Sequence, residues 1–92
     1  MSIEFEWDEQ KRPSNLQKHG IDFVRACKIF DSFTVEFEDI RYDYGEDRYI
    51  AVDETSGQIL TVVYTYRSDV IRLISARQAT KYEKNLYYSD DY

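Results

Sequence analysis

Residues 48–76 of this chain are RYIAVDETSGQILTVVYTYRSDVIRLISA, and most of the predicted sheet lies within them. They contain three runs rich in β-branched and aromatic residues, RYIAVDE (48–54), QILTVVYTYR (58–67) and DVIRLISA (69–76), with TSG and RSD at the junctions. Such runs favour strands, whereas Gly, Ser and Asp favour turns. Connections this short join antiparallel neighbours. With the preceding run FTVEFED (33–39) and the turn DYGED (43–47), the sequence predicts a four-stranded antiparallel sheet.

The segment before the sheet predicts one short strand and two helices. IEFEW (3–7) alternates apolar and acidic residues, which is typical of a half-buried strand. A turn is expected at 8–12 and a helix from about Pro13, because proline disrupts a helix interior. Gly20 should end that helix. Asp22 can cap a second one, because Phe23, Ala26, Cys27 and Phe30 then form one apolar face.

The segment after the sheet predicts a final helix over roughly residues 81–88. Thr80 and Glu83 match the S/T-x-x-E capping box, in which each side chain bonds the other residue's backbone amide. The order strand, two helices, four strands, helix indicates an α+β architecture. We expect a single domain over residues 1–92, since a chain this short supports one core.

Composition excludes several classes of protein. No apolar run is long enough to span a bilayer, and the acidic start MSIEFEWDE does not resemble a secretory signal. We therefore expect a cytoplasmic protein without membrane contact. Cys27 is the one cysteine, so it can form no internal disulfide, and its apolar neighbours predict a core position. With a single histidine as well, the sequence favours neither a bound metal nor any other cofactor.

The charge is unevenly distributed. The net charge is −6, but residues 55–84 hold five basic residues against two acidic ones. This basic third could form a local site for an anion. Alternatively, acidic neighbours neutralise it across the folded surface, and charge alone does not decide between these interpretations.

The leading candidates for an anion site are arginines of the late strands. Arg72 interrupts the apolar run 70–74, and a guanidinium there needs water, an acid or a ligand. The structural alternative is a pair with an acid such as Asp53 or Glu36. Arg77 precedes the last helix, whose N-terminus attracts anions, and Lys81 lies on its first turn. Together with Arg67 these bases could grip a phosphate, or they could form a solvated rim.

His19 and two tyrosines are the remaining candidates. His19 follows Lys18 at a predicted helix end, where the helix dipole favours positive charge whatever the function. The catalytic alternative is proton transfer near neutral pH, to a leaving 5′ oxygen or from a ribose 2′ hydroxyl. Tyr64 and Tyr66 could stack on unpaired RNA bases, although most tyrosines of the chain should pack in the core or at an interface.

Several motifs combine into a family pattern. They are Phe5-Glu6-Trp7-Asp8, Asn15-Leu16-Gln17-Lys18-His19-Gly20-Ile21 and Arg72-Leu73-Ile74-Ser75-Ala76-Arg77-Gln78-Ala79-Thr80, with Phe23 and Phe30-Asp31 between them. In this order the chain resembles the BrnT family of toxins from type II toxin–antitoxin systems. It departs from the family at Pro13, at Tyr64, where a histidine is common, and in its acidic net charge.

The resemblance implies a RelE-like fold and metal-independent cleavage of RNA, which inhibits translation. It further implies neutralisation by a ribbon-helix-helix antitoxin of the BrnA type, through which the pair contacts operator DNA. The implied site residues are Lys18, His19, Arg67, Arg72 and Arg77, with Lys81 as a lesser member. Two alternatives remain, a catalytically inactive module that binds the antitoxin and acts as operon co-repressor, and a plain structural or adaptor domain.

Overall fold

The chain forms a five-stranded mixed sheet with helices on both faces. The computed structural model describes residues 3–31, 35–40 and 45–89. The strands are β1 (Glu4–Trp7), β2 (Val35–Asp39), β3 (Arg48–Thr55), β4 (Gln58–Arg67) and β5 (Val70–Gln78), in the spatial order β1-β5-β4-β3-β2. The helices are α1 (Lys11–His19), α2 (Phe23–Ala26) with the 3₁₀ turn η1 (Cys27–Asp31), and α3 (Lys81–Tyr88). The α+β class is therefore confirmed.

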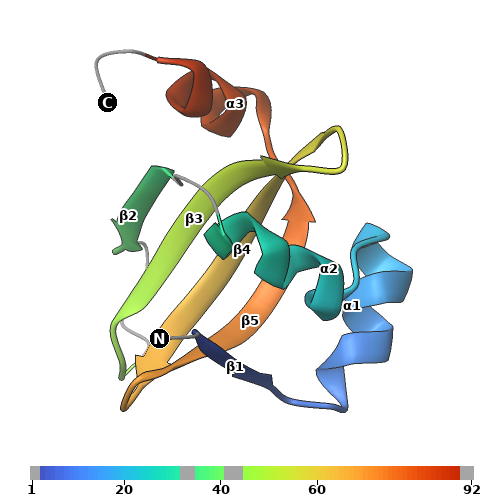
Figure 1. Ribbon diagram of the computed structural model, residues 1–92, viewed down its shortest axis with the longest axis vertical. Helices are drawn as coiled ribbons and strands as arrows, with labels where there is room; N and C mark the ends of the chain where they lie inside the picture. Colours follow the sequence, from blue (N-terminus) through green and yellow to red (C-terminus); the bar gives the residue numbers. More distant parts are fainter. Residues whose placement is uncertain (1–2, 32–34, 41–44, 90–92) are drawn as a thin grey trace.

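Two hydrophobic clusters lie on opposite faces of the sheet. One joins residues of α2 and η1, such as Phe23 and Ile29, to Leu60, Val62 and Tyr64 of β4 and to β5. The other joins alternate sheet residues such as Ile50 and Val63 to Leu86 and Tyr87 of α3. Figure 1 shows α1 and α2 together beside β5, and α3 apart from them where β5 ends. We name these the α2 face and the α3 face.

The prediction for β1 was incomplete. This strand exists, but it joins the sheet in parallel with β5, and Phe5 and Trp7 lie opposite Ile71 and Leu73. The sheet is thus five-stranded and mixed rather than four-stranded and antiparallel. The antiparallel pairs β2–β3, β3–β4 and β4–β5 match the prediction. Residues 33–34 of the predicted FTVEFED strand and 43–44 of the predicted DYGED turn lie outside the described residues.

Helix α1 begins earlier than predicted. It starts at Lys11, so Pro13 lies in its first turn, where backbone amides have no partner within the helix. Proline therefore costs no hydrogen bond at that position. The predicted stop is confirmed, because Gly20 has φ 73° and donates its N–H to the Leu16 carbonyl at 2.8 Å.

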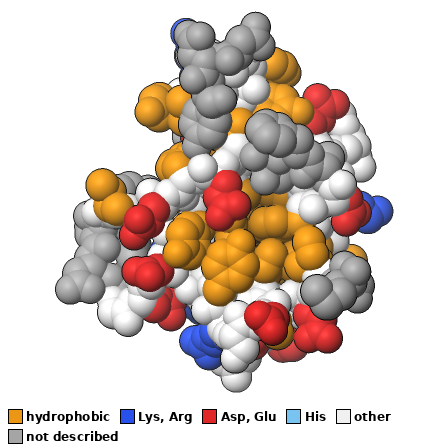
Figure 2. All heavy atoms as spheres, turned by 60° about the vertical axis from the view of Figure 1, so that its left-hand side comes forward, with side chains coloured by type: hydrophobic (Ala, Val, Ile, Leu, Met, Phe, Trp, Pro, Cys, Tyr) orange, Lys and Arg blue, Asp and Glu red, His pale blue; other side chains and the backbone are white. Residues whose placement is uncertain are grey.

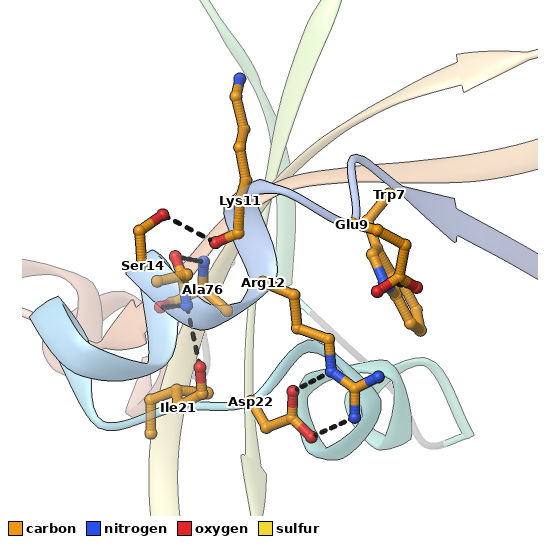
Figure 3. A network of polar contacts seen from close by, with 9 residues as sticks. Trp7, Glu9, Lys11, Arg12, Ser14, Ile21, Asp22 and Ala76 are labelled. Atoms are coloured by element: carbon orange, nitrogen blue, oxygen red, sulfur yellow. Dashed lines mark hydrogen bonds and ion pairs between the residues drawn. The ribbon is translucent and has the colours of Figure 1, made fainter.

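Asp22 precedes α2 as predicted, but its side chain makes no capping hydrogen bond. Its carboxylate instead accepts two hydrogen bonds from the Arg12 guanidinium, at 2.7 and 3.0 Å, and this pair lowers the pKa of Asp22 (Figure 3). Arg12 also lies 5.8 Å from the centre of the Trp7 ring. The helix is shorter than its apolar pattern suggests, because it changes to a 3₁₀ turn at Cys27.

The capping box is confirmed, and the predicted core position of Cys27 is confirmed in part, because this residue is only partly buried. The Thr80 hydroxyl accepts from the Glu83 amide at 3.2 Å, and the Glu83 carboxylate accepts from the Thr80 amide at 2.8 Å. Cys27 packs against the cluster of the α2 face, and burial raises the pKa of its thiol to about 11. Across the described residues, no helix is long and apolar enough to cross a membrane.

Candidate functional site

Two adjoining depressions lie between α1 and the part of the sheet where β4 ends and β5 begins. The first is lined by Asp8, Lys11, Glu46, Arg48, Arg67, Arg72, Leu73 and Ile74. The second is lined by Lys11, Ser14, Asn15, Lys18, His19, Ile74 and Ser75. They share Lys11 and Ile74, so they form one continuous feature, the basic cleft. Four of the predicted residues meet here, namely Lys18, His19, Arg67 and Arg72.

Asn15 fixes the position of α1 beside the cleft. Its buried side-chain amide donates to the Ile21 carbonyl at 2.8 Å and to the Ala76 carbonyl at 2.9 Å, and its oxygen accepts from the Ala76 amide at 3.2 Å. The pairing of β1 with β5 ends at Leu73. Beyond that point, the Asn15 side chain bonds the backbone of β5 in place of a neighbouring strand. Lys18 and His19 are thereby held next to β5.

A β-bulge shapes the floor of the cleft. The register between β4 and β5 shifts between Val63 and Tyr64, so Ile74 is an extra residue on β5. Leu73 and Ala76 both belong to the core of the α2 face, and the two residues between them line the cleft. Bulges commonly redirect side chains in this way next to functional sites.

Arg72 is held by one acid. Its Nη1 donates to Glu6 Oε2 at 2.5 Å, and the two residues are direct neighbours across the β1–β5 pair. The sequence-based alternative of a structural acid was right in kind but wrong in identity, since the acid is neither Asp53 nor Glu36. A guanidinium has five N–H donors. Because Glu6 is its one acceptor among the described residues, Arg72 keeps donors for a ligand.

Other bases of the cleft have fewer restraints. In the described part of the chain, the side chains of Lys11, Lys18 and Arg67 take part in no ion pair. Figure 3 shows Lys11 extending away from the Arg12–Asp22 pair. Arg48 lies 3.3 Å from the Glu46 carboxylate. His19 is the last residue of α1 and is partly buried.

Arg77 does not join the cleft. Its guanidinium donates to both carboxylate oxygens of Glu83, at 2.7 and 2.9 Å, and Thr61 donates to the same carboxylate at 2.9 Å. Burial alone would raise the pKa of Glu83, but hydrogen bonds from Arg77, the Thr80 amide and Thr61 together lower it to about 2. We name this arrangement the α3 clamp. Along β5, Arg77 lies roughly 15 Å from Arg72 at the usual rise of a strand.

The remaining predicted residues also lie elsewhere. Tyr64 is completely buried, so the expectation that it stacks on an RNA base is wrong. Tyr66 is half exposed but belongs to the opposite face from its neighbour Arg67, because consecutive strand residues alternate. Lys81 begins α3, beside the α3 clamp, and lines neither depression.

Sequence reasoning missed several residues that line or support the cleft, among them Glu6, Lys11, Asn15 and Arg48. Glu6 could have been suspected from the alternation of IEFEW, which places Glu4 and Glu6 on one face. Asn15 lies in the same motif as Lys18 and His19, so its proximity to them was visible. Nothing local to Lys11 or Arg48 distinguished them from other surface bases.

Comparison with known proteins identifies one family. The model of "Ribonuclease toxin, BrnT, of type II toxin-antitoxin system" matches residues 7–83. This range includes α1, the sheet from β2 to β5, and the α3 clamp. A search of curated proteins found no match.

Proposed function

The chain belongs to the BrnT family of ribonuclease toxins from type II toxin–antitoxin systems, and from this membership we propose that it cleaves RNA in the basic cleft and thereby inhibits translation in the cytoplasm. The observation that carries the proposal is the meeting of six basic side chains, against the two acids Asp8 and Glu46, in two adjoining depressions of a chain with net charge −6. These are Lys11, Lys18, His19, Arg48, Arg67 and Arg72.

The cleft suits a single-stranded polyanion. Contacts to phosphate come mostly from Lys and Arg, and a groove lined by them follows the nucleic-acid backbone. Arg67 and Arg72 line the first depression, and Lys18 and His19 line the second. Lys11 belongs to both and lies between these two pairs. Successive phosphates can therefore occupy the two depressions, with the ribose between them over Ile74.

The proposed reaction is attack of a ribose 2′ oxygen on the adjacent phosphorus. The new bond forms as the bond to the 5′ oxygen breaks, which leaves a 2′,3′-cyclic phosphate and a 5′ hydroxyl. Arg67 and Arg72 stabilise the charge that develops on the phosphate oxygens. His19 takes the proton from the 2′ hydroxyl as general base, and the leaving 5′ oxygen takes a proton from water. Lys18 holds the neighbouring phosphate.

The proposed protein partner is a BrnA-like antitoxin of the ribbon-helix-helix class. Type II systems neutralise the toxin by direct binding of an antitoxin protein, so family membership supports a protein partner of this kind. The antitoxin supplies any contact with operator DNA, and the toxin reaches the operator only through it.

The test is cleavage of a defined single-stranded RNA by the purified chain in the presence of a chelator. We expect Arg67→Ala and His19→Ala each to lower the cleavage rate by about a hundredfold or more. Lys18→Ala should weaken RNA binding severalfold and reduce its dependence on salt. Lys28→Ala is the matched control, because it removes an exposed lysine of η1 that lines neither depression, and it should cleave normally.

The product ends test the chemistry separately. A cyclic phosphate at the 3′ end supports attack by the 2′ hydroxyl, and a substrate with 2′-deoxyribose at the cleavage position should resist. If the wild-type chain binds its antitoxin but leaves RNA intact, the inactive co-repressor module becomes the better account.

A further inference from the structure

An aromatic surface lies on the α2 face, away from the basic cleft. It consists of Phe30, Tyr49 and Tyr66 around a buried Tyr64. Tyr64 meets the Phe30 ring edge-on at 5.1 Å and the Tyr66 ring at 5.7 Å, and the rings of Tyr49 and Tyr66 are 5.5 Å apart. The side chain of Tyr66 is 48% exposed. Connected aromatic rings that reach water often mark a site of interaction.

Acidic residues border this surface. Glu38 is the cross-strand partner of Tyr49, and both it and Glu36 are exposed on β2. Burial raises the pKa of Tyr49, and the negative charges of Asp47, Glu38 and Glu36 raise it further. Figure 2, which looks onto the side of β2, shows apolar side chains gathered in one patch with acidic side chains around it. Negatively charged side chains therefore border the aromatic surface.

Tyr64 forms the floor of the surface. Its hydroxyl is buried, and its pKa is raised first by burial and then by interactions with the neighbouring Glu36 and Tyr66 side chains. The acidic side of the surface therefore extends down to this hydroxyl.

We propose that the aromatic surface is the docking site for a basic segment of the antitoxin. The proposal rests on the proposed function for the identity of the partner. Arginine or lysine side chains of that segment stack on Tyr49 and Tyr66 and pair with Glu38 and Asp47. Tyrosines suit such a role, because they give a large contact area at low entropic cost and arginine is their frequent partner at interfaces.

Charge excludes the other candidate occupants of this surface. RNA phosphates would meet Glu36, Glu38 and Asp47, which repel them. A second copy would bring the same acids face to face around a two-fold axis. Only a positively charged partner can interact favourably with both the aromatic rings and the acidic residues that border them.

The site is also separate from the basic cleft. Tyr66 and Arg67 are consecutive residues of β4, so their side chains lie on opposite faces of the sheet. Binding at the aromatic surface therefore leaves Arg67 and Arg72 uncovered by that contact. Binding of antitoxin and cleavage of RNA can then be disrupted independently by mutation.

The test measures affinity for a BrnA-like ribbon-helix-helix antitoxin, first sought as the product of a short gene adjoining this chain's own, by calorimetry at low and high salt. We expect Glu38→Lys and Tyr66→Ser each to weaken binding about tenfold or more, the first because it sets a like charge against the basic segment and the second because it removes a central ring. Glu54→Lys makes the same charge change at the far end of β3 and should bind normally. All three variants should cleave RNA at the wild-type rate, and thermal unfolding checks that they fold.

Each outcome separates the two proposals. If Glu38→Lys and Tyr66→Ser bind the antitoxin as tightly as the wild type does, the docking site is overturned, whatever the chain does to RNA. If these variants lose the antitoxin while the wild type cuts no RNA, the docking site stands and the nuclease proposal fails. A wild-type chain that dimerises alone, and becomes monomeric with Tyr66→Ser, would assign the surface to self-association and overturn the proposal.

Discussion

Arg72 and Arg77 lie on the same strand and are almost equally exposed, with 24% and 25% of their side chains accessible, yet their surroundings differ. The difference lies in the glutamates that they contact. Glu83 is 10% exposed, and its carboxylate is shared by Arg77, Thr61 and the Thr80 amide. Glu6 is 39% exposed and bonds one nitrogen of Arg72. An arginine is therefore structural or available for a ligand according to how completely its acid is enclosed.

Replacing either arginine with alanine should give the largest effects, on RNA cleavage for Arg72 and on stability for Arg77. Arg72→Ala should lower RNA cleavage by about a hundredfold or more, because a donor to the developing phosphate charge is lost.

Arg77→Ala should lower the free energy of unfolding by about 3 kcal/mol, because Glu83 remains buried without its cation. Denaturant unfolding and single-turnover cleavage on each variant separate the two effects. A stable Arg77→Ala protein that no longer cuts would reverse the comparison.

Acid should weaken the α3 clamp. The pKa of Glu83 is about 2 in the folded chain against an ordinary value of 4.5. A lowered pKa stabilises the folded state above the ordinary value, and this stabilisation disappears as the pH falls toward the folded value. The shift corresponds to about 3 kcal/mol as an upper limit.

The measurement for this acid effect is urea unfolding of wild type and Glu83→Gln between pH 5 and pH 2, where the shift in pKa lies. The gap in stability between them should narrow as the pH falls across this window. The contribution of Asp22, whose pKa is also lowered, is common to both proteins and cancels. A constant gap would show that the Glu83 charge does not stabilise the fold.

The smallest effect is expected at Glu6. Glu6→Gln removes a negative charge from the cleft and releases Arg72, so RNA should bind about two- to fivefold more tightly, as expected for a partly exposed pair. Fluorescence anisotropy with labelled RNA at two salt concentrations measures this. Weaker binding would mean that Glu6 orients Arg72 rather than competing with the phosphate.

Local patterns predicted the elements that depend on neighbouring residues. The Thr80–Glu83 capping box gave the bounds of α3, and Gly20 gave the end of α1, because these signals act within one helical turn. The strands β3 to β5 followed from composition and short turns. The start of α1 was misplaced because Pro13 was treated as an interior residue, although it is harmless in a first turn.

Long-range pairing could not be predicted in the same way. The partner of Arg72 is Glu6, at the other end of the chain, and the parallel pairing of β1 with β5 brings them together. Membership of Arg77 in a clamp could have been inferred, because Glu83 follows it closely and already belongs to the capping box. The strand pattern of β4 places Tyr64 and Tyr66 on one face and Arg67 on the other. It does not predict which face carries the cleft, because that depends on where α1 packs.

The parallel edge formed by β1 also governs when the protein can act during its synthesis. The first strand has no neighbour until β5 has left the ribosome, and Asn15 likewise waits for Ala76 before it can anchor α1. A nascent chain thus carries Lys18 and His19 long before the rest of the cleft exists. Translation that stops ahead of Arg72 should therefore release fragments that lack the cleft, because β5 must be complete before β1 and α1 can take their places beside it.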